Sequence, residues 1–200
     1  MYPNIDLGKQ MHLDRLLVKI AVSGLVLAGC GRMSASKEKI HRVIDTYPDG
    51  QVNSEHVYDT EDDTMSYVIL EHFPNELVSF QGEVKEGKFV GAKLNYYDNG
   101  VLRSIDSLRH PCDLLECCCD GRVLRYYRNG KSDQDFELKD NLRNGHYHFY
   151  SRDSTGVMIT SSLYSNDMKN GPCTTYYESG AIKTIGTYRN DTLSGDEVRF

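Results

Sequence analysis

The stretch that decides the fold is KLNYYDNG, residues 93–100. Apolar and polar side chains alternate up to the tyrosine pair, which is the period-two pattern of a β-strand. Asn99-Gly100 follows, and this dipeptide is the strongest short hairpin signal because both residues tolerate positive φ. We therefore expect a strand, a tight turn and a returning strand over residues 101–107.

The same pattern recurs along the chain. Its turn position falls at residues 76, 100, 130, 156 and 180, and a second series of glycines follows at residues 91, 121, 145, 171 and 195. The basic unit is 24 residues long, with six residues inserted between Gly100 and Gly121 and two between Gly145 and Gly156. Residues 47–50 mark a degenerate first unit. The sequence predicts an all-β fold, an extended single-layer antiparallel meander of about six 24-residue β-hairpin repeats.

The second turn of each unit is expected to differ from the first. Residues 140–145, 166–171 and 190–195 are rich in asparagine and aspartate and end in glycine. We interpret them as loops of four to five residues with the glycine in the left-handed conformation.

The aromatic residues fall into two columns, because successive strand side chains point to opposite faces. The first column, in phase with Leu94, is expected to form the core of a thin sheet and comprises His72, Tyr96, Tyr126, Phe149 and Tyr176. The second, in phase with Lys93 and Arg125, starts at Phe73. Its four tyrosines are the predicted partner-binding residues: Tyr97, Tyr127, Tyr150 and Tyr177.

The amino-terminal residues resemble the signal of a bacterial lipoprotein. A basic segment precedes a short apolar run that ends in Leu27-Ala28-Gly29-Cys30. The resemblance implies a signal peptide over residues 1–29 and lipid attachment at Cys30, with Met1 or Met11 as the start. A lipidated tether over residues 30–42 and the repeat domain over residues 43–200 would follow. The expected location is the bacterial cell envelope, on the periplasmic side of the outer membrane if the host is Gram-negative.

Five cysteines remain besides Cys30, and four of them are candidates for a disulfide. Outside the cytoplasm Cys112 could pair with Cys117 or Cys119, or one of these could pair with Cys173. Three adjacent cysteines on a strand cannot converge on one metal ion, so no metal site is expected there.

No catalytic motif, metal site or cofactor is expected elsewhere, apart from the covalent lipid. His146 and His148 share a strand face, and the acidic loop at residues 59–63 lacks the spacing of a calcium loop. The net charge of −6 argues against nucleic acid as a partner. It also predicts that acidic residues steer a basic protein partner.

The repeat resembles the MORN-variant repeat. Its pattern is Tyr-Tyr-x-[Asn/Ser]-Gly-x-hydrophobic, followed by Tyr/Leu-x-[Asn/Asp]-x-x-x-x-Gly. The chain is similar to the bacterial YwqK-family antitoxins, many of which are lipoproteins, over residues 73–200 and less so over residues 43–72. The resemblance implies sheets of β-hairpins with no shared catalytic residue.

The predicted function is therefore non-catalytic. We expect a membrane-anchored lipoprotein that binds a protein partner, with a toxin–antitoxin or immunity role implied by the resemblance, and no small-molecule substrate. The alternative is an envelope scaffold that contacts cell wall or lipid. A hydrolase with a site outside the repeats is the third hypothesis.

Overall fold

The computed structural model describes residues 38–114, 120–153 and 156–200, which belong to one compact unit, Lys37–Phe200. These residues form strands and no helix, so none of them builds a helix that could span a membrane. The strands are β1 (Ile40–Thr46), β2 (Val52–Tyr58), β3 (Ser66–His72), β4 (Val78–Lys85), β5 (Lys88–Tyr96), β6 (Leu102–Leu108), β7 (Cys112–Asp113), β8 (Gly121–Tyr126), β9 (Ser132–Lys139), β10 (Leu142–Tyr150), β11 (Met158–Ser165), β12 (Met168–Tyr176), β13 (Ile182–Arg189), β14 (Thr192–Leu193) and β15 (Val198–Arg199).

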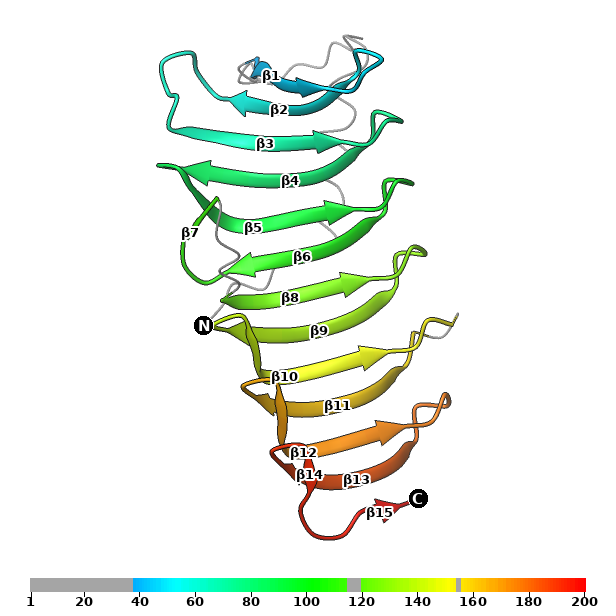
Figure 1. The fold of residues 1–200 in the computed structure, drawn as a ribbon. Helices are drawn as coiled ribbons and strands as arrows, with labels where there is room; N and C mark the ends of the chain where they lie inside the picture. Colours follow the sequence, from blue (N-terminus) through cyan, green and yellow to red (C-terminus); the bar gives the residue numbers. More distant parts are fainter. Residues whose placement is uncertain (1–37, 115–119, 154–155) are drawn as a thin grey trace, which may run out of the picture. The chain divides into compact units, whose positions relative to one another are not determined.

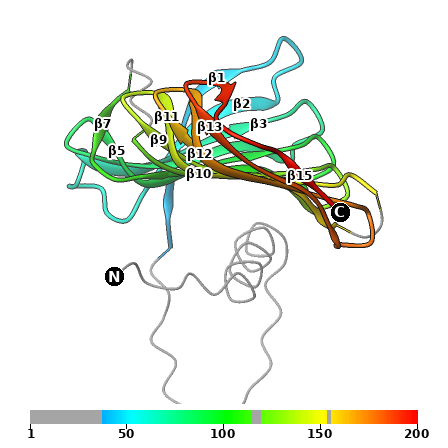
Figure 2. The same cartoon turned by 90° about the horizontal axis from the view of Figure 1, so that it is seen from below.

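All strands belong to one antiparallel sheet that follows the order of the chain, as Figure 1 shows. Two short strands leave the main path, because β7 pairs with the start of β5 and β15 pairs with β13. Figure 2, seen along the stack of strands, shows a single bent layer. The predicted all-β, single-layer meander is confirmed. Six hairpins, from β1–β2 to β12–β13, form the predicted repeats.

The first turns at residues 47–50, 97–100, 127–130 and 177–180 are type I turns with a glycine bulge, and Glu76 takes the place of the glycine in the second repeat. In none of these five turns do both central residues have positive φ. In the third repeat the Gly100 amide donates to the Tyr97 carbonyl at 2.8 Å, and the Tyr97 amide donates to the Val101 carbonyl at 2.8 Å. Only Gly100 has positive φ, at 77°, while Asn99 does not. The Asn99 side chain accepts a hydrogen bond from the Val101 amide at 3.2 Å, which explains the preference for asparagine at this position.

The second turns are two-residue turns in which both central residues have positive φ, as in type I′. The pairs are Glu86-Gly87, Asp140-Asn141, Asn166-Asp167 and Asn190-Asp191. The expected loop length of four to five residues was wrong, whereas the positive φ expected for the glycines is confirmed at Gly145, Gly171 and Gly195, with values of 115°, 127° and 91°. The glycines at residues 145 and 171 instead lie within strands, at bulges where the pairing register shifts. Asparagine and aspartate tolerate positive φ better than other side chains, so they could form these turns themselves.

Successive repeats are joined at the first turns by tyrosine hydroxyls. Tyr97 Oη donates to the carbonyl of Tyr126 at 2.9 Å, and Tyr127 Oη donates to the carbonyl of Tyr150 at 2.8 Å. Tyr47 and Tyr177 repeat this contact with the carbonyls of His72 and Phe200. The bonds of Tyr47, Tyr97 and Tyr127 link a turn to the end of the first strand of the next repeat, and that of Tyr177 links the last turn to the residue after β15, so the repeated tyrosine has a structural role.

Replacing Tyr97 or Tyr127 by phenylalanine should therefore lower the free energy of unfolding by about 1 kcal/mol each, because one inter-repeat hydrogen bond is lost while the ring remains. Chemical denaturation of the single variants measures this. Tyr150→Phe is the matched control, since no hydrogen bond from its hydroxyl is seen among the described residues. It should change stability by less than about 0.5 kcal/mol. Equal losses in all three variants would contradict this role of the hydroxyls.

The register places the side chains on two distinct faces. The aliphatic face is defined by the paired row Leu94, Ile105 and Leu124. The cationic face is defined by the residues of opposite phase, including Lys93, Arg125 and Phe136. Buried apolar side chains occur on both faces: Leu94 and Ile105 on the first, and Tyr58, Val84, Val123, Phe136 and Cys173 on the second. Among the side chains that the structure describes, Val84 is the only fully buried hydrophobic one, as expected for a sheet without a second layer.

Candidate binding face of the sheet

The cationic face carries a series of arginine and lysine side chains that lie over aromatic rings. Nine such contacts have the cation 4.3 to 5.8 Å from the ring centre. By strand register and phase, all of the rings lie on this face: Tyr58, Phe89, Tyr97, Phe136, Tyr147, Tyr164, Tyr177 and Tyr188. The alkyl stems of the cations cover the rings while the charges stay in water.

The contacts merge into a ladder at the centre of this face. Arg125 lies 5.2 Å from the ring centre of Phe136, which is 6.0 Å from that of Tyr147. The next ring, Tyr164, is 5.3 Å from Tyr147, and Arg143 lies over both tyrosines at 5.8 and 4.3 Å. Burial raises the pKa of Tyr147, so its hydroxyl stays neutral well into alkaline pH. This ladder spans four neighbouring strands, β8 to β11.

Ion pairing differs between the two faces. On the aliphatic face, Arg122 meets Asp135 at 2.6 Å, Lys85 meets Glu83 at 2.9 Å and Lys88 meets Asp113 at 3.4 Å. On the cationic face, six side chains have no carboxylate within 4 Å among the described residues: Arg42, Lys93, Arg103, Arg125, Lys169 and Lys183. These six cations rest on aromatic rings, and Lys93 and Arg125 also lie near Asp106.

Three of the four predicted partner-binding tyrosines lie on the cationic face. Tyr97, Tyr127 and Tyr177 follow its strand residues in phase, as predicted, and their hydroxyls are engaged in the inter-repeat bonds. Burial and the neighbouring Asp133 raise the pKa of Tyr127 to about 12. Tyr177 is the most open of the three, with 44% of its surface exposed.

Tyr150 was assigned to the wrong column. It pairs with Met158 across the same register shift that pairs Tyr126 with Ser132, so it occupies the first column and points to the aliphatic face. Ser151 takes the turn position that Tyr97 has in the third repeat. Phe149, which was assigned to the first column, lies on the cationic face instead. The two inserted residues of this repeat lie in the loop after Tyr150 and not before it.

Cys112 and Cys173 are buried and free among the described residues. Cys112 lies beside β5, and Cys173 in β12 accepts a hydrogen bond from Ser162 Oγ at 3.1 Å. Five strands separate β5 from β12, which is far beyond the reach of a disulfide between these two residues. Cys117 and Cys119 lie outside the described residues, as does Cys30, so lipidation and the other disulfide pairings stay predictions.

Three histidines on the aliphatic face, His41, His72 and His148, contact carboxylates. His146 and His148 stack with ring centres 6.0 Å apart, and His148 Nδ1 lies 3.9 Å from Asp135. A second cluster was not anticipated: Glu55 is buried and contacts His41 Nδ1 at 2.8 Å and His72 Nε2 at 3.1 Å. Across residues 38–114, 120–153 and 156–200, no three histidine, cysteine, aspartate or glutamate side chains are placed to hold a metal ion.

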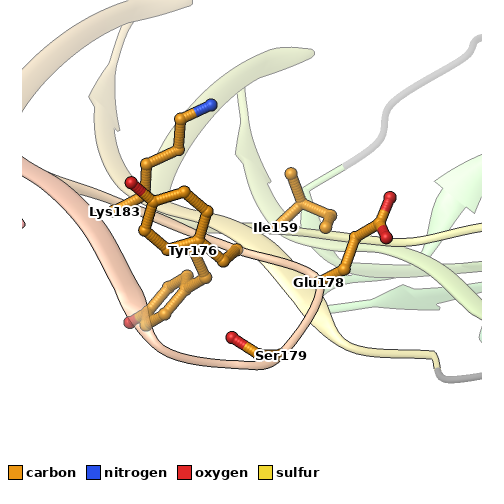
Figure 3. A pocket seen from close by; sticks show the side chains of 6 residues that line it. Ile159, Tyr176, Glu178, Ser179 and Lys183 are labelled. Atoms are coloured by element: carbon orange, nitrogen blue, oxygen red, sulfur yellow. The ribbon is translucent and has the colours of Figure 1, made fainter.

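A shallow hollow of about 490 Å³ lies at the last repeat, between the end of β12 and the start of β13. Ile159, Tyr176 and Ser179 contribute to its lining. In Figure 3 the polar ends of Lys183 and Glu178 point in different directions, so the charged groups of the hollow do not converge on one point. The hollow lacks the convergent polar groups of a small-molecule site.

The series of similar hairpins in one sheet defines a β-hairpin repeat protein. Residues 169–190, which cover most of β12 and β13, match the family model of the MORN repeat variant. The other five hairpins follow the same strand order, and four of them, β3–β4, β5–β6, β8–β9 and β10–β11, also share the register shift at the end of the first strand, so the predicted MORN-type repeat architecture is confirmed. No curated protein matches the chain.

The unpaired cations were missed at the level of the sequence. Arg125 and Lys93 were recognised as sharing a phase with the second tyrosine column, but the charge was judged from the net value of −6. The alternation of the strand residues contained the signal for this face. Arginine and lysine recur on one side of the strands, whereas most carboxylates lie in turns, as do Asp49, Asp98 and Asp191.

Proposed function

We propose that this chain is a non-catalytic binding protein that holds a protein partner against its cationic face. The observation that carries the proposal is the concentration of the nine cation–ring contacts on one face of a single-layer sheet. Tyrosine and arginine contribute more binding energy than other residues in protein interfaces, because they combine apolar area with polar groups. A half-buried ring under a guanidinium group offers both at once.

The proposal extends to the cell envelope through Cys30. A lipid on this cysteine would hold the repeats at the membrane surface, where the sheet could cover a toxin and block its action sterically. The lipobox-like segment and the resemblance to the YwqK-family antitoxins support this role. A toxin partner should lose its toxicity when the chain is co-expressed, whereas a structural partner would show no such effect.

Site-directed photo-crosslinking tests the binding face. We expect p-benzoylphenylalanine in place of Arg103, an exposed residue of the cationic face, to capture one dominant protein in envelope extracts. The matched control places the same group at Lys139, which is exposed on the aliphatic face. Mass spectrometry identifies the crosslinked product.

Capture from both positions, or from Lys139 alone, would refute the assignment of the face. Crosslinks to lipid or cell wall without protein would favour an envelope scaffold and would also reject the proposal.

A further inference from the structure

We infer that the partner presents an extended acidic segment to the cationic face, a conclusion that rests on the proposed function and specifies its partner. The six cations without a carboxylate carry it: Arg42, Lys93, Arg103, Arg125, Lys169 and Lys183. On the aliphatic face most cations are already neutralised by aspartate or glutamate. In the described part of the chain the cationic face therefore has more cations left to pair with an anionic partner, six against Lys139 and Arg189 on the aliphatic face.

The geometry of the cations suits carboxylates. Arg125 lies over Phe136 and donates from Nη1 to Gln134 Oε1 at 3.4 Å, which leaves the Nε–Nη2 edge of its guanidinium group for a two-pronged contact. Such a group is partly desolvated by the ring beneath it, which strengthens its attraction to an added carboxylate. The same holds for Arg103 over Tyr97, at 5.8 Å from the ring centre.

The negative net charge of the chain does not oppose this partner. Many carboxylates lie in the turns at the two ends of the strands, and charges more than about 10 Å apart are largely screened at physiological salt. Burial raises the pKa of Asp106, one of the few carboxylates among the cations, despite Lys93 and Arg125 nearby. Over the middle of the face Lys93 and Arg125 outnumber Asp106, the carboxylate that lies near them.

The distribution of charge favours a polypeptide over a lipid surface. The cations run from β1 to β13, a path of twelve strands that extends about 50 Å at the usual strand spacing. Glu71, Asp106 and Asp133 lie among them on the same face. A uniformly anionic bilayer would be repelled at these points, whereas an acidic segment can place a basic or neutral residue there.

Binding of a labelled poly-L-glutamate to the full chain tests the inference. Wild-type protein should bind it, and the triple variant Arg103→Gln, Arg125→Gln, Lys183→Gln should bind about 10-fold more weakly or worse, because three exposed ion pairs are lost. The matched control removes three positive charges from the aliphatic face, in Lys85→Gln, Lys139→Gln, Arg189→Gln. It should change the affinity by less than about 3-fold. Thermal melting confirms that both variants fold.

Three outcomes would overturn the inference: no binding of poly-L-glutamate, equal loss in both triple variants, or selective binding of phosphatidylglycerol vesicles through the same three residues. Failure here is distinguishable from failure of the proposed function. If a partner is crosslinked at position 103 and its binding is unchanged in the triple variant, the assignment of the binding face stands. Only the inference of an acidic segment is then rejected.

Discussion

Gly121→Ala should lower the free energy of unfolding by at least about 4 kcal/mol, the largest effect that we expect from a single substitution. An alanine Cβ at this position would lie 1.8 Å from the carbonyl oxygen of Ser107 and 2.9 Å from its carbon. These are backbone atoms of β6, held in place because Leu108 pairs with Gly121. The φ of 148° adds strain for any residue with a side chain. Denaturant unfolding of the purified chain measures the loss.

Gly50→Ala is the matched control. Gly50 also has a positive φ, 86°, but an added Cβ would meet nothing within 4 Å. Its cost should be limited to backbone strain, about 1 to 2 kcal/mol. If both variants lost the same stability, the close approach of β6 and β8 at the six-residue insertion would not be the cause.

Cys30→Ser should move most of the protein from the membrane fraction to the soluble fraction, since the covalent lipid is the proposed anchor. Each buried methylene group of an acyl chain contributes about 0.8 kcal/mol to membrane binding, so loss of the lipid is nearly all-or-none. Cell fractionation followed by immunoblotting measures the shift. Mass spectrometry of the mature protein should find the lipid on an amino-terminal Cys30.

Cys173→Ser keeps Cys30 and should stay with the membrane. Membrane retention of the Cys30→Ser variant at the wild-type level would reject the proposed lipid attachment, while leaving the repeat fold and its binding face unaffected.

The periodicity of the sequence was sufficient to predict the sheet. Tyrosine pairs, Asn-Gly turns and spaced glycines set the strands and their order, because alternation and turn chemistry act locally. Tyr150 shows where such alignment fails. It was aligned from the downstream Gly156, across the two inserted residues. Counting from Gly145 gives the same five-residue step that leads from Gly171 to Tyr176, and it places Tyr150 in the correct column.

The turn geometries could not be predicted from residue types alone. Asp167 illustrates the reason: its carboxylate accepts hydrogen bonds from the amide and from Nε of Arg143, at 2.9 and 2.8 Å. These contacts come from the preceding repeat and hold a type I′ turn that carries no glycine. They also lower the pKa of Asp167. A contact between repeats decides the turn, and a single repeat does not contain that information.

The binding face was predicted only in part. Tyr97 and Tyr177 were placed on the correct side of the sheet, but Arg143 and Tyr164 were not recognised. Their contact joins residues that are 21 positions apart and depends on the bulge near Gly145, which brings Arg143 into phase with the rings. The sign of the partner's charge also depends on which cations form ion pairs within the fold. The composition of the chain does not show which cations these are.

Hydroxyl-radical footprinting of the complex with the crosslinked partner tests the central claim most directly. The tyrosines of the two faces serve as internal controls for one another. On partner binding, Tyr147, Tyr164 and Tyr188 of the cationic face should be protected from oxidation, while Tyr126, Tyr150 and Tyr176 of the aliphatic face should react as in the free protein. Protection confined to the aliphatic face, or equal protection of both, would contradict the account.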